Sequence, residues 1–152
     1  MGKRGRYKKQ KPVEIFEKYF IKNRTECWNW TGKIHKITGY GNFSANIGDG
    51  ERKTFLSHRF SYEAYRDKIP EGMTIDHLCR NRRCVNPSHL EVVTLKENIL
   101  RGNGISAINK RKTHCIRGHI LSDKNLYITP DNRRQCKKCG NMRQDKWKIN
   151  NR

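Results

Sequence analysis

Residues 76–89, Asp-His-Leu-Cys-Arg-Asn-Arg-Arg-Cys-Val-Asn-Pro-Ser-His, decide the fold of this chain. The stretch that precedes them is expected to form a short strand that delivers His77 at its end. Asn86 stands before a proline as a helix cap does, so one helical turn that carries His89 is expected there. A strand followed by a turn that folds back on it would bring Asp76 and His89 together.

The residue types in this stretch suit the hydrolysis of a phosphodiester bond. That reaction needs a nucleophilic water, charge stabilisation in the transition state and help for the leaving oxygen. One divalent cation held by few protein ligands can serve the last two needs. Asp76 and His89 are ligands of suitable type for such a cation. His77 would then point away from the cation and take the proton from water, because neutral imidazole is well populated near pH 7.

Short helical and β-prone segments surround this stretch. Gly48-Asp49-Gly50 is a turn signal between two β-prone runs, and Ser57 is placed to cap the helix that follows. The Thr-x-x-Glu sequence that begins at Thr94 fits a capping box. The predicted fold class is therefore α+β with a small antiparallel sheet. The expected elements are a helix over 13–22, a hairpin over 40–47 and 53–56, a helix over 57–67 and a helix from 94 to about 101.

The charge of the chain is its strongest compositional feature. The formal net charge is +20 over 152 residues, of which only 34% are hydrophobic, so a large core is not expected. Residues 1–12 carry six Lys or Arg and no acid, and residues 110–152 carry thirteen against three acids. Two basic arms therefore flank a nearly neutral middle. Counterion release favours a polyanionic partner for such arms, and nucleic acid is the expected one.

No membrane or export signal is apparent in the sequence. No stretch approaches the roughly 18 apolar residues that span a bilayer, and the Lys-rich start is not followed by the apolar segment of a signal peptide. A cytoplasmic protein is expected. In a reducing compartment the six cysteines would serve as metal ligands or buried thiols rather than disulfides.

The middle of the chain closely resembles the HNH, or ββα-metal, endonuclease family, and in particular the small HNH enzymes of bacteriophages, which include intron-encoded homing endonucleases. The motifs that carry the resemblance are Cys27-Trp28-Asn29-Trp30-Thr31-Gly32, Gly39-Tyr40-Gly41, His58-Arg59, Ile75-Asp76-His77, Asn86-Pro87-Ser88-His89-Leu90 and Glu97-Asn98.

This resemblance implies a role for each residue of the candidate site. Asp76 and His89 would be the ligands of a divalent cation, and His77 would be the general base. Asn86 would tie the loop together and orient His77, and Asn98 would buttress the site from the next helix. Intron-encoded relatives often have Asn in place of His89, and imidazole favours softer ions, so Mn²⁺, Ni²⁺ and Zn²⁺ are candidates alongside Mg²⁺. The resemblance also implies a phage protein made in a bacterial host.

The last forty residues carry a separate set of metal-ligand types. Cys115-x3-His119 and Cys136-x2-Cys139 are separated by 16 residues, which suits a tetrahedral structural zinc. So few apolar residues lie there that the module would need the free energy of zinc binding to fold, on the order of 10 kcal/mol or more. Phage HNH proteins have similar zinc elements. His114 is a second candidate for the place of His119.

Three further cysteines have no such clear pattern. Cys79 and Cys84 bracket residues 80–83, and Cys27 opens the first β-prone segment, so the thiols are expected to meet and fasten the loop to the sheet. They would form either a second zinc site or a packed thiol cluster. A zinc site needs a fourth ligand, for which His58 is a candidate. HNH relatives without these cysteines also have His-Arg at the matching place, which favours a role for His58 in the fold or the active site.

Basic residues near the candidate site and in the C-terminal arm are candidates for contacts with DNA. Guanidinium groups in the loop before Asn86 are placed to clamp phosphates on either side of the scissile bond. The C-terminal cations would hold flanking duplex, and phosphate contacts position a protein without specifying sequence. The candidates are Arg80, Arg82, Arg83, Lys110, Arg111, Lys112, Arg117, Arg133, Arg134, Lys137 and Lys138.

These features predict a metal-dependent endonuclease that nicks or cuts double-stranded DNA with a water activated by His77. A ββα site acts on one strand at a time, so a monomer would nick, and a double-strand break would need a homodimer or a second event. The alternative is a non-catalytic DNA-binding or packaging-accessory protein on the same scaffold. The expected organisation is a basic flexible arm over 1–12, a nuclease domain over 13–103, a basic linker over 104–112 and a zinc-binding module over 113–152.

Overall fold

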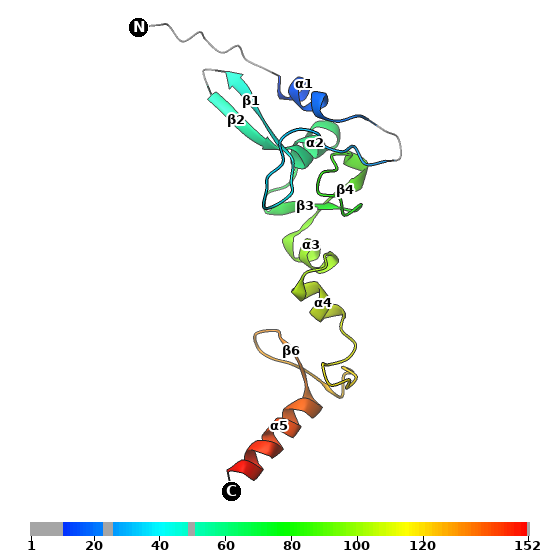
Figure 1. Cartoon of the computed structure of the whole chain (residues 1–152), viewed down its shortest axis with the longest axis vertical. Helices are drawn as coiled ribbons and strands as arrows, with labels where there is room; N and C mark the ends of the chain where they lie inside the picture. Colours follow the sequence, from blue (N-terminus) through cyan, green and yellow to red (C-terminus); the bar gives the residue numbers. More distant parts are fainter. Residues whose placement is uncertain (1–10, 23–25, 49–50, 152) are drawn as a thin grey trace, which may run out of the picture. The chain divides into compact units, whose positions relative to one another are not determined.

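A computed structural model describes residues 11–22, 26–48 and 51–151 (Figure 1). The chain divides into two compact units, residues 1–98 and residues 99–152. Most of the basic arm predicted for residues 1–12 lies outside the described residues. Within the described part of the chain, every helix is too short or too polar to cross a membrane.

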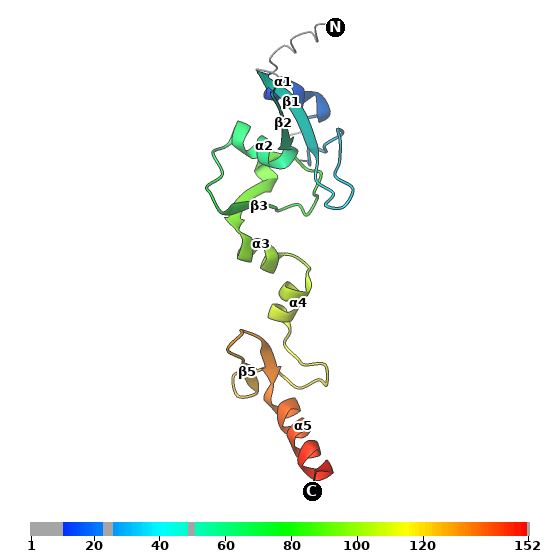
Figure 2. The same ribbon diagram turned by 90° about the vertical axis from the view of Figure 1, so that its left-hand side faces the viewer.

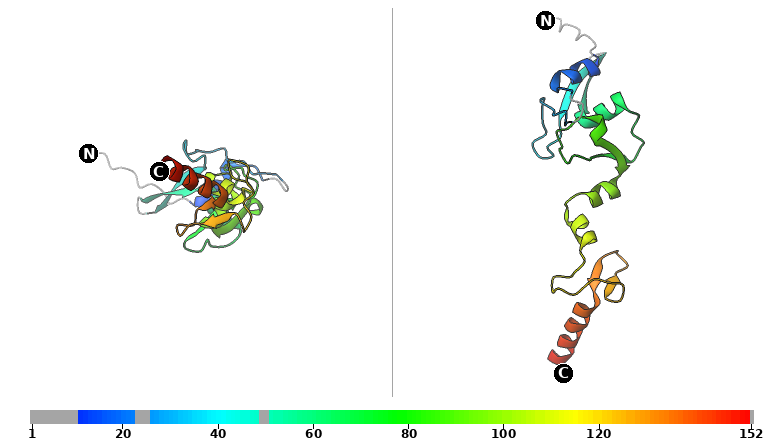
Figure 3. Two further views of the ribbon diagram at one scale, coloured as in Figure 1. Left: turned by 90° about the horizontal axis from the view of Figure 1, so that it is seen from below. Right: turned by 90° about the vertical axis from the view of Figure 1, so that its right-hand side faces the viewer.

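The first unit is α+β, as predicted, and contains two separate antiparallel pairs rather than one sheet. The predicted hairpin is confirmed by β1 and β2, and β3 pairs with β4 around the candidate site. In Figures 1 and 3, α1 lies against β1, and the two elements are in contact. The elements are α1 (Pro12–Phe16), η1 (Glu17–Tyr19), β1 (Asn42–Gly48), β2 (Glu51–Leu56), α2 (Ser57–Tyr65), β3 (Met73–His77), η2 (Pro87–His89), β4 (Leu90–Thr94) and α3 (Leu95–Arg101).

An aromatic cluster forms the core of this unit. Phe16 is fully buried, and its ring centroid lies 5.4 Å from that of Trp30 and 5.7 Å from that of Phe43. Rings at these separations gain edge-to-face and offset contacts in addition to the burial of their apolar surface. The core of this unit therefore depends on a few large rings.

The first helix is shorter than the predicted 13–22. It ends at Phe16 and continues only as the 3-10 turn η1, because Phe20 is extended and buries its ring beside that of Phe16, 4.8 Å away. The carbonyl of Tyr19 accepts hydrogen bonds from the amide and the hydroxyl of Thr31, both at 2.7 Å. A contact with another segment thus takes the acceptor that a longer helix would have used.

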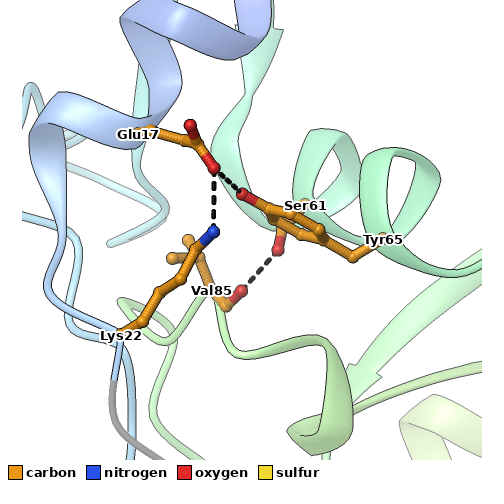
Figure 4. Close-up of polar contacts among 5 residues, drawn as sticks. All are labelled: Glu17, Lys22, Ser61, Tyr65 and Val85. Carbon is orange, nitrogen blue, oxygen red and sulfur yellow. Dashed lines mark hydrogen bonds and ion pairs between the residues drawn. The ribbon is translucent and has the colours of Figure 1, made fainter.

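Polar contacts fasten η1 and the loop before η2 to α2 (Figure 4). The carboxylate of Glu17 accepts hydrogen bonds from the hydroxyl of Tyr65 at 2.6 Å and from the ammonium of Lys22 at 2.8 Å. The hydroxyl of Ser61, which is fully buried, donates to the carbonyl of Val85. Helix α2 is therefore the element against which the N-terminal segment and the loop before η2 are both placed.

Helix α2 begins one residue earlier than the capping prediction implied. Leu56 occupies the cap position and has no side-chain cap, and Ser57 is the first helical residue. The amide of Ser57 donates to the carbonyl of Gly41 at 2.9 Å, and its side chain is buried. The prediction that Ser57 is the cap was wrong, because packing against the start of β1 takes precedence over capping. The capping box at Thr94 is confirmed, since Thr94 and Glu97 exchange hydrogen bonds of 3.1–3.2 Å.

Gly41 is a position where the fold requires the absence of a side chain. A Cβ there would collide with the ring of Trp30 and the hydroxyl of Ser57. We expect Gly41→Ala to lower the free energy of unfolding by about 1–3 kcal/mol, measured by thermal denaturation, because overpacking a core displaces neighbours. Gly104→Ala is the control, because a Cβ there meets nothing within 4 Å. Equal melting temperatures for the two variants would contradict this packing.

The second unit consists of a short helix, a hairpin and a longer C-terminal helix (Figure 2). Residues 105–111 form a helix in the stretch predicted as a linker, and Ala107 is buried. The guanidinium of Arg134 donates to the carbonyls of Asn109, Lys110 and Lys112 at 2.6–3.0 Å, which satisfies acceptors at the end of this helix. The elements are α4 (Ile105–Arg111), β5 (Leu126–Ile128), β6 (Arg134–Cys136) and α5 (Lys137–Asn150).

Candidate active site and metal centres

The β3–β4 pair positions the two central residues of the candidate site. Asp76 is opposite Glu91, and His77, the last residue of β3, is opposite Leu90. The side chain of Asn98, in α3, donates to the carbonyl of Ile75 at 3.3 Å, and this hydrogen bond connects α3 to β3. Asp76 and His77 are only 3% and 5% exposed, respectively.

One hydrogen bond fixes the orientation of His77. Its Nε2 lies 3.2 Å from the carbonyl oxygen of Cys84. A carbonyl only accepts, so Nε2 carries the proton, and in the neutral ring Nδ1 has the free lone pair. Burial lowers the pKa of His77, while the Cys84 carbonyl and the charge of Asp76 act in the opposite direction. The ring is therefore neutral at physiological pH and can accept a proton at Nδ1.

Two further rings, those of His58 and Tyr40, lie beside His77. The ring centroid of His58 is 5.1 Å from that of His77, and the ring centroid of Tyr40 is 4.6 Å from that of His58. Burial, together with the neighbouring His77, lowers the pKa of His58 to about 3, so this ring adds no positive charge. Nδ1 of His58 is buried without a hydrogen-bond partner among the described residues. Tyr40 was not among the predicted site residues, although the Gly-Tyr-Gly sequence marked its position.

The carboxylate of Asp76 forms an ion pair within its own loop. Arg80 donates from Nη1 to Oδ1 of Asp76 at 2.7 Å. The backbone of Arg80 has a positive φ of 58°, which residues other than glycine rarely adopt. This conformation lets the loop turn sharply after β3. A cation at Asp76 would share the carboxylate with this guanidinium. Arg80 is therefore an ion-pair partner of Asp76 as well as a candidate for phosphate contact.

Three thiols and His89 meet beside the same loop. The ligand atoms of Cys27, Cys79, Cys84 and His89 all lie within 4.8 Å of one another. Nδ1 of His89 is 3.6 Å from Sγ of Cys27 and 3.6 Å from Sγ of Cys84. Zinc bound at the usual lengths of 2.3 Å to sulfur and 2.0–2.1 Å to nitrogen separates tetrahedral S and N ligands by about 3.6 Å. The donor set and its spacing thus fit zinc.

Pairing between two segments brings Cys27 to the loop. The amide of Trp30 donates to the carbonyl of Arg83 at 2.8 Å, and the amide of Val85 donates to the carbonyl of Trp28 at 2.9 Å. Burial raises the pKa of the Cys79 thiol and raises that of Cys84 to about 12. A metal cation would be needed to hold such thiols as thiolates at neutral pH.

The fourth member of this group is His89 rather than His58. The structure places His58 beside His77, and it places His89 with the thiols and not in a group with Asp76. The sequence contained a signal for this arrangement, because Cys79, Cys84 and His89 recur at intervals of five residues.

Asn86 connects this loop to the segment that carries Cys27. Its side chain accepts a hydrogen bond from the amide of Ser88 at 3.0 Å and donates to the carbonyl of Glu26 at 2.9 Å. The backbone amide of Asn86 also donates to Sγ of Cys84 at 3.4 Å. The bond that orients His77 comes from the backbone of Cys84, so Asn86 acts on His77 through this loop.

The second unit contains the other Cys/His group. Cys115, His119, Cys136 and Cys139 bring their ligand atoms within 4.8 Å of one another. Sγ of Cys115 is 3.7 Å from Sγ of Cys139, where tetrahedral zinc requires about 3.8 Å, and 3.6 Å from Nδ1 of His119. The group therefore contains His119 and not His114. Both Cys/His groups of the described chain are consistent with zinc.

Some of the predicted DNA-contact residues form hydrogen bonds or ring contacts within the protein, and others have exposed side chains. Arg82 donates to the carbonyl of Thr38 at 3.0 Å and lies over the Tyr40 ring, and Arg134 is engaged at the end of α4. Arg111 donates to the carbonyl of Gly102 at 3.0 Å. Those with exposed side chains include Arg83, Lys110, Lys112, Arg117, Arg133, Lys137 and Lys138.

Comparison with known proteins finds one matching family and several similar phage proteins. A family model described as HNH endonuclease matches residues 55–100. The uncharacterized gene 5.3 protein of Enterobacteria phage T3 is 39% identical over 72 residues, which are 45% of this chain and 71% of that protein. Protein 2.8 of Escherichia phage T7 is 35% identical over 101 residues, which are 66% of this chain and 60% of that protein.

A solved structure titled "DNA binding and cleavage by the HNH homing endonuclease I-HmuI" is also similar, with 24% identity and a TM-score of 0.42, over 73% of this chain and 66% of that one. The family match covers the strand, loop and turn that carry Asp76, His77 and His89. The relative from phage T3 matches over most of its own length. This chain belongs to the HNH endonuclease family.

Proposed function

We propose that this protein is a metal-dependent endonuclease that hydrolyses phosphodiester bonds of double-stranded DNA. The observation that carries the proposal is the buried His77, whose Nε2 is held by the Cys84 carbonyl and whose Nδ1 is left as the base, next in the chain to the buried Asp76. A protein that only binds DNA has no need of a buried neutral histidine in a fixed tautomer. The net charge of +20 supports a polyanionic substrate.

Asp76 is the residue we propose to hold the divalent cation. A buried carboxylate beside the general base is a suitable ligand for Mg²⁺, Mn²⁺ or Ni²⁺, and Mg²⁺ in particular is often bound by one or two carboxylates together with water and substrate phosphate. When bound, the cation supplies charge stabilisation for the transition state and for the leaving oxygen. The resemblance implies His89 as a second ligand beside Asp76, but we propose it instead as the fourth ligand of a structural zinc, because its Nδ1 faces the thiols.

The chain's own residues then divide the remaining tasks. His77 takes the proton of the attacking water at Nδ1, because Nε2 is occupied by the carbonyl of Cys84. His58 stays neutral beside it and packs the ring without competing for the proton. Arg83 and the guanidiniums of the same loop are placed to hold the phosphates that flank the scissile bond.

The three-thiol zinc site would keep this geometry in place. Cys84 supplies a thiol to the site and, through its carbonyl, the acceptor for His77. A metal that fixes Cys84 therefore fixes the direction of Nδ1, as outer partners do for catalytic groups. The second site would fold the C-terminal module in the same way.

The test of the function is cleavage of supercoiled plasmid with Mg²⁺, Mn²⁺ or Ni²⁺ added to protein that has been dialysed against metal-free buffer. Prolonged EDTA is avoided, because it would also strip structural zinc, and the zinc content is measured in the same samples. Open-circle product that depends on the added cation supports a nicking enzyme, and linear product supports action by a dimer or by two events. Supercoiled DNA in every lane, with the protein still bound in a gel shift, would favour the DNA-binding alternative.

The identity of the fourth zinc ligand has a direct test. We expect the purified chain to contain two zinc ions by elemental analysis, His89→Ala to contain one, and His58→Ala to retain two. The reason is that Nδ1 of His89 lies 3.6 Å from two of the thiols, whereas His58 lies beside His77. If His89→Ala still contained two zinc ions, His89 would not be a zinc ligand, and the assignment of His89 to the cation at Asp76 would be favoured.

A further inference from the structure

Helix α5 is anchored at its first turn and exposed along the rest of its length. The amide of Lys137 donates to the carbonyl of Asn125 at 2.9 Å, and the amide of Lys138 donates to the side chain of Asn125 at 3.0 Å. Cys136 and Cys139 belong to the second Cys/His group, so a zinc ion would fix the same turn. Residues 141–150 are all exposed, and in Figures 2 and 3 the helix runs on beyond the hairpin of its unit.

The composition of α5 is unusual for a helix that covers its own protein. It has five basic residues and one acidic residue in 14 and buries none of them. Among its apolar residues, Met142 and Ile149 share a face, but Trp147 lies on the other side, so no continuous apolar stripe exists. A polar helix of this length is marginal in water without a partner. The charge of α5 identifies a polyanion as the partner that complements it.

One face of α5 carries a row of residues suited to base recognition. Lys137, Asn141, Gln144 and Lys148 are spaced at i, i+4, i+7 and i+11, which places them within an arc of about 60° and along about 16 Å of helix. All four are exposed. At a rise of about 3.4 Å per base pair, this row spans about five base pairs.

The chemistry of this row matches the donors and acceptors of the major groove. Asn and Gln can each form two hydrogen bonds with an adenine, and Lys can donate to O6 and N7 of a guanine. The groove is about 12 Å wide and admits a helix. Lys138 and Arg143 lie on the two sides of this row, where a helix in the groove meets the phosphates of the two strands, and Lys146 lies on the opposite face. Asp145 borders the row and can accept from N4 of a cytosine.

We propose that α5 is a recognition helix that enters the major groove of duplex DNA and reads about five base pairs through Lys137, Asn141, Gln144 and Lys148. This proposal rests on the proposed function only in that the substrate is duplex DNA. It assigns sequence preference to the C-terminal module and leaves the chemistry to the first unit. The bases expected opposite the row are purines, with adenine opposite Asn141 and Gln144.

The test is selection of binding sites from a random duplex library with the full-length chain carrying His77→Ala, so that the DNA remains intact. Asn141→Ala/Gln144→Ala in the same background is compared with Asn150→Ala, which removes an exposed asparagine on the opposite face of α5. We expect an enriched site of about five base pairs. Affinity for that site should fall roughly five- to hundredfold per residue removed from the row, with unchanged affinity for random DNA. Asn150→Ala should match the parent. Circular dichroism and zinc content confirm that each variant folds.

Three results would overturn the proposal. They are the absence of any enriched sequence, the same enriched site and affinity in the double variant, and self-association of the chain through α5 that Trp147→Ala abolishes in sedimentation. None of these affects the cleavage of plasmid DNA that depends on His77. A failure of the recognition helix is therefore distinguishable from a failure of the nuclease.

Discussion

His77→Ala is expected to reduce the rate of plasmid cleavage by about 10²–10⁴-fold at saturating divalent cation, because it removes the base that takes the proton from water. The affinity for duplex DNA should stay within about twofold, since the buried ring of His77 carries no net charge. Cleavage is measured by the conversion of supercoiled plasmid to open circle, and affinity by gel shift in the absence of added cation.

The matched control is His35→Ala, which removes a histidine of the same unit. His35 is exposed and bonds only within its own turn, where it contacts Thr38. The His35→Ala variant should cleave plasmid at the parental rate. Equal cleavage by His77→Ala and the parent would remove the proposed mechanism, and equal losses in both cleavage and binding would indicate unfolding rather than loss of a base.

Removal of zinc from the first unit is expected to have the largest effect on stability. Cys27→Ser takes one ligand from the three-thiol group without changing β3 or the loop that follows His77. The chain should then lose one of two zinc ions. It should also lose the cooperative unfolding transition of the first unit, because structural zinc supplies on the order of 10 kcal/mol at such sites. Cleavage should disappear with it, since Cys84 also holds His77.

Cys139→Ser provides the comparison from the other Cys/His group. It should also lose one zinc ion, but the first unit should keep its unfolding transition, and cleavage at high protein concentration and low salt should persist. Elemental analysis and calorimetry separate the two variants. If Cys27→Ser retained two zinc ions and the parental melting temperature, the three thiols would be a packed cluster and not a metal site.

The local elements of the first unit were predictable because each depends on short-range rules. The hairpin of β1 and β2 follows from β-prone runs on either side of a glycine turn, and the Thr94 capping box follows from hydroxyl and carboxylate groups three residues apart. Helix α1 was not predictable in length, because the carbonyl of Tyr19 is taken by Thr31, which is 12 residues away. The start of α2 was decided in the same way by Gly41.

In the candidate site, too, the features set by local sequence were predictable and those set by distant contacts were not. The sequence identified the C-terminal Cys/His group and predicted roles for Asp76, His77 and Asn86, because the types and local spacing of these residues are typical of metal and acid–base chemistry. It did not assign His89 to the thiols, because the third thiol, Cys27, is 62 residues from His89 in the chain. It also did not place Tyr40 and His58 beside His77, because they come from other segments than β3.

The sequence alone therefore determined the family and the presence of soft metal ligands and predicted a polyanionic partner, because all three depend on residue type and local spacing. The tertiary structure alone decided which histidine joins the three thiols and which nitrogen of His77 is free. The physical reason is that both depend on the pairing of residues 28–30 with the loop at 83–85, which brings Cys27 to His89 and shapes the loop whose Cys84 carbonyl meets His77.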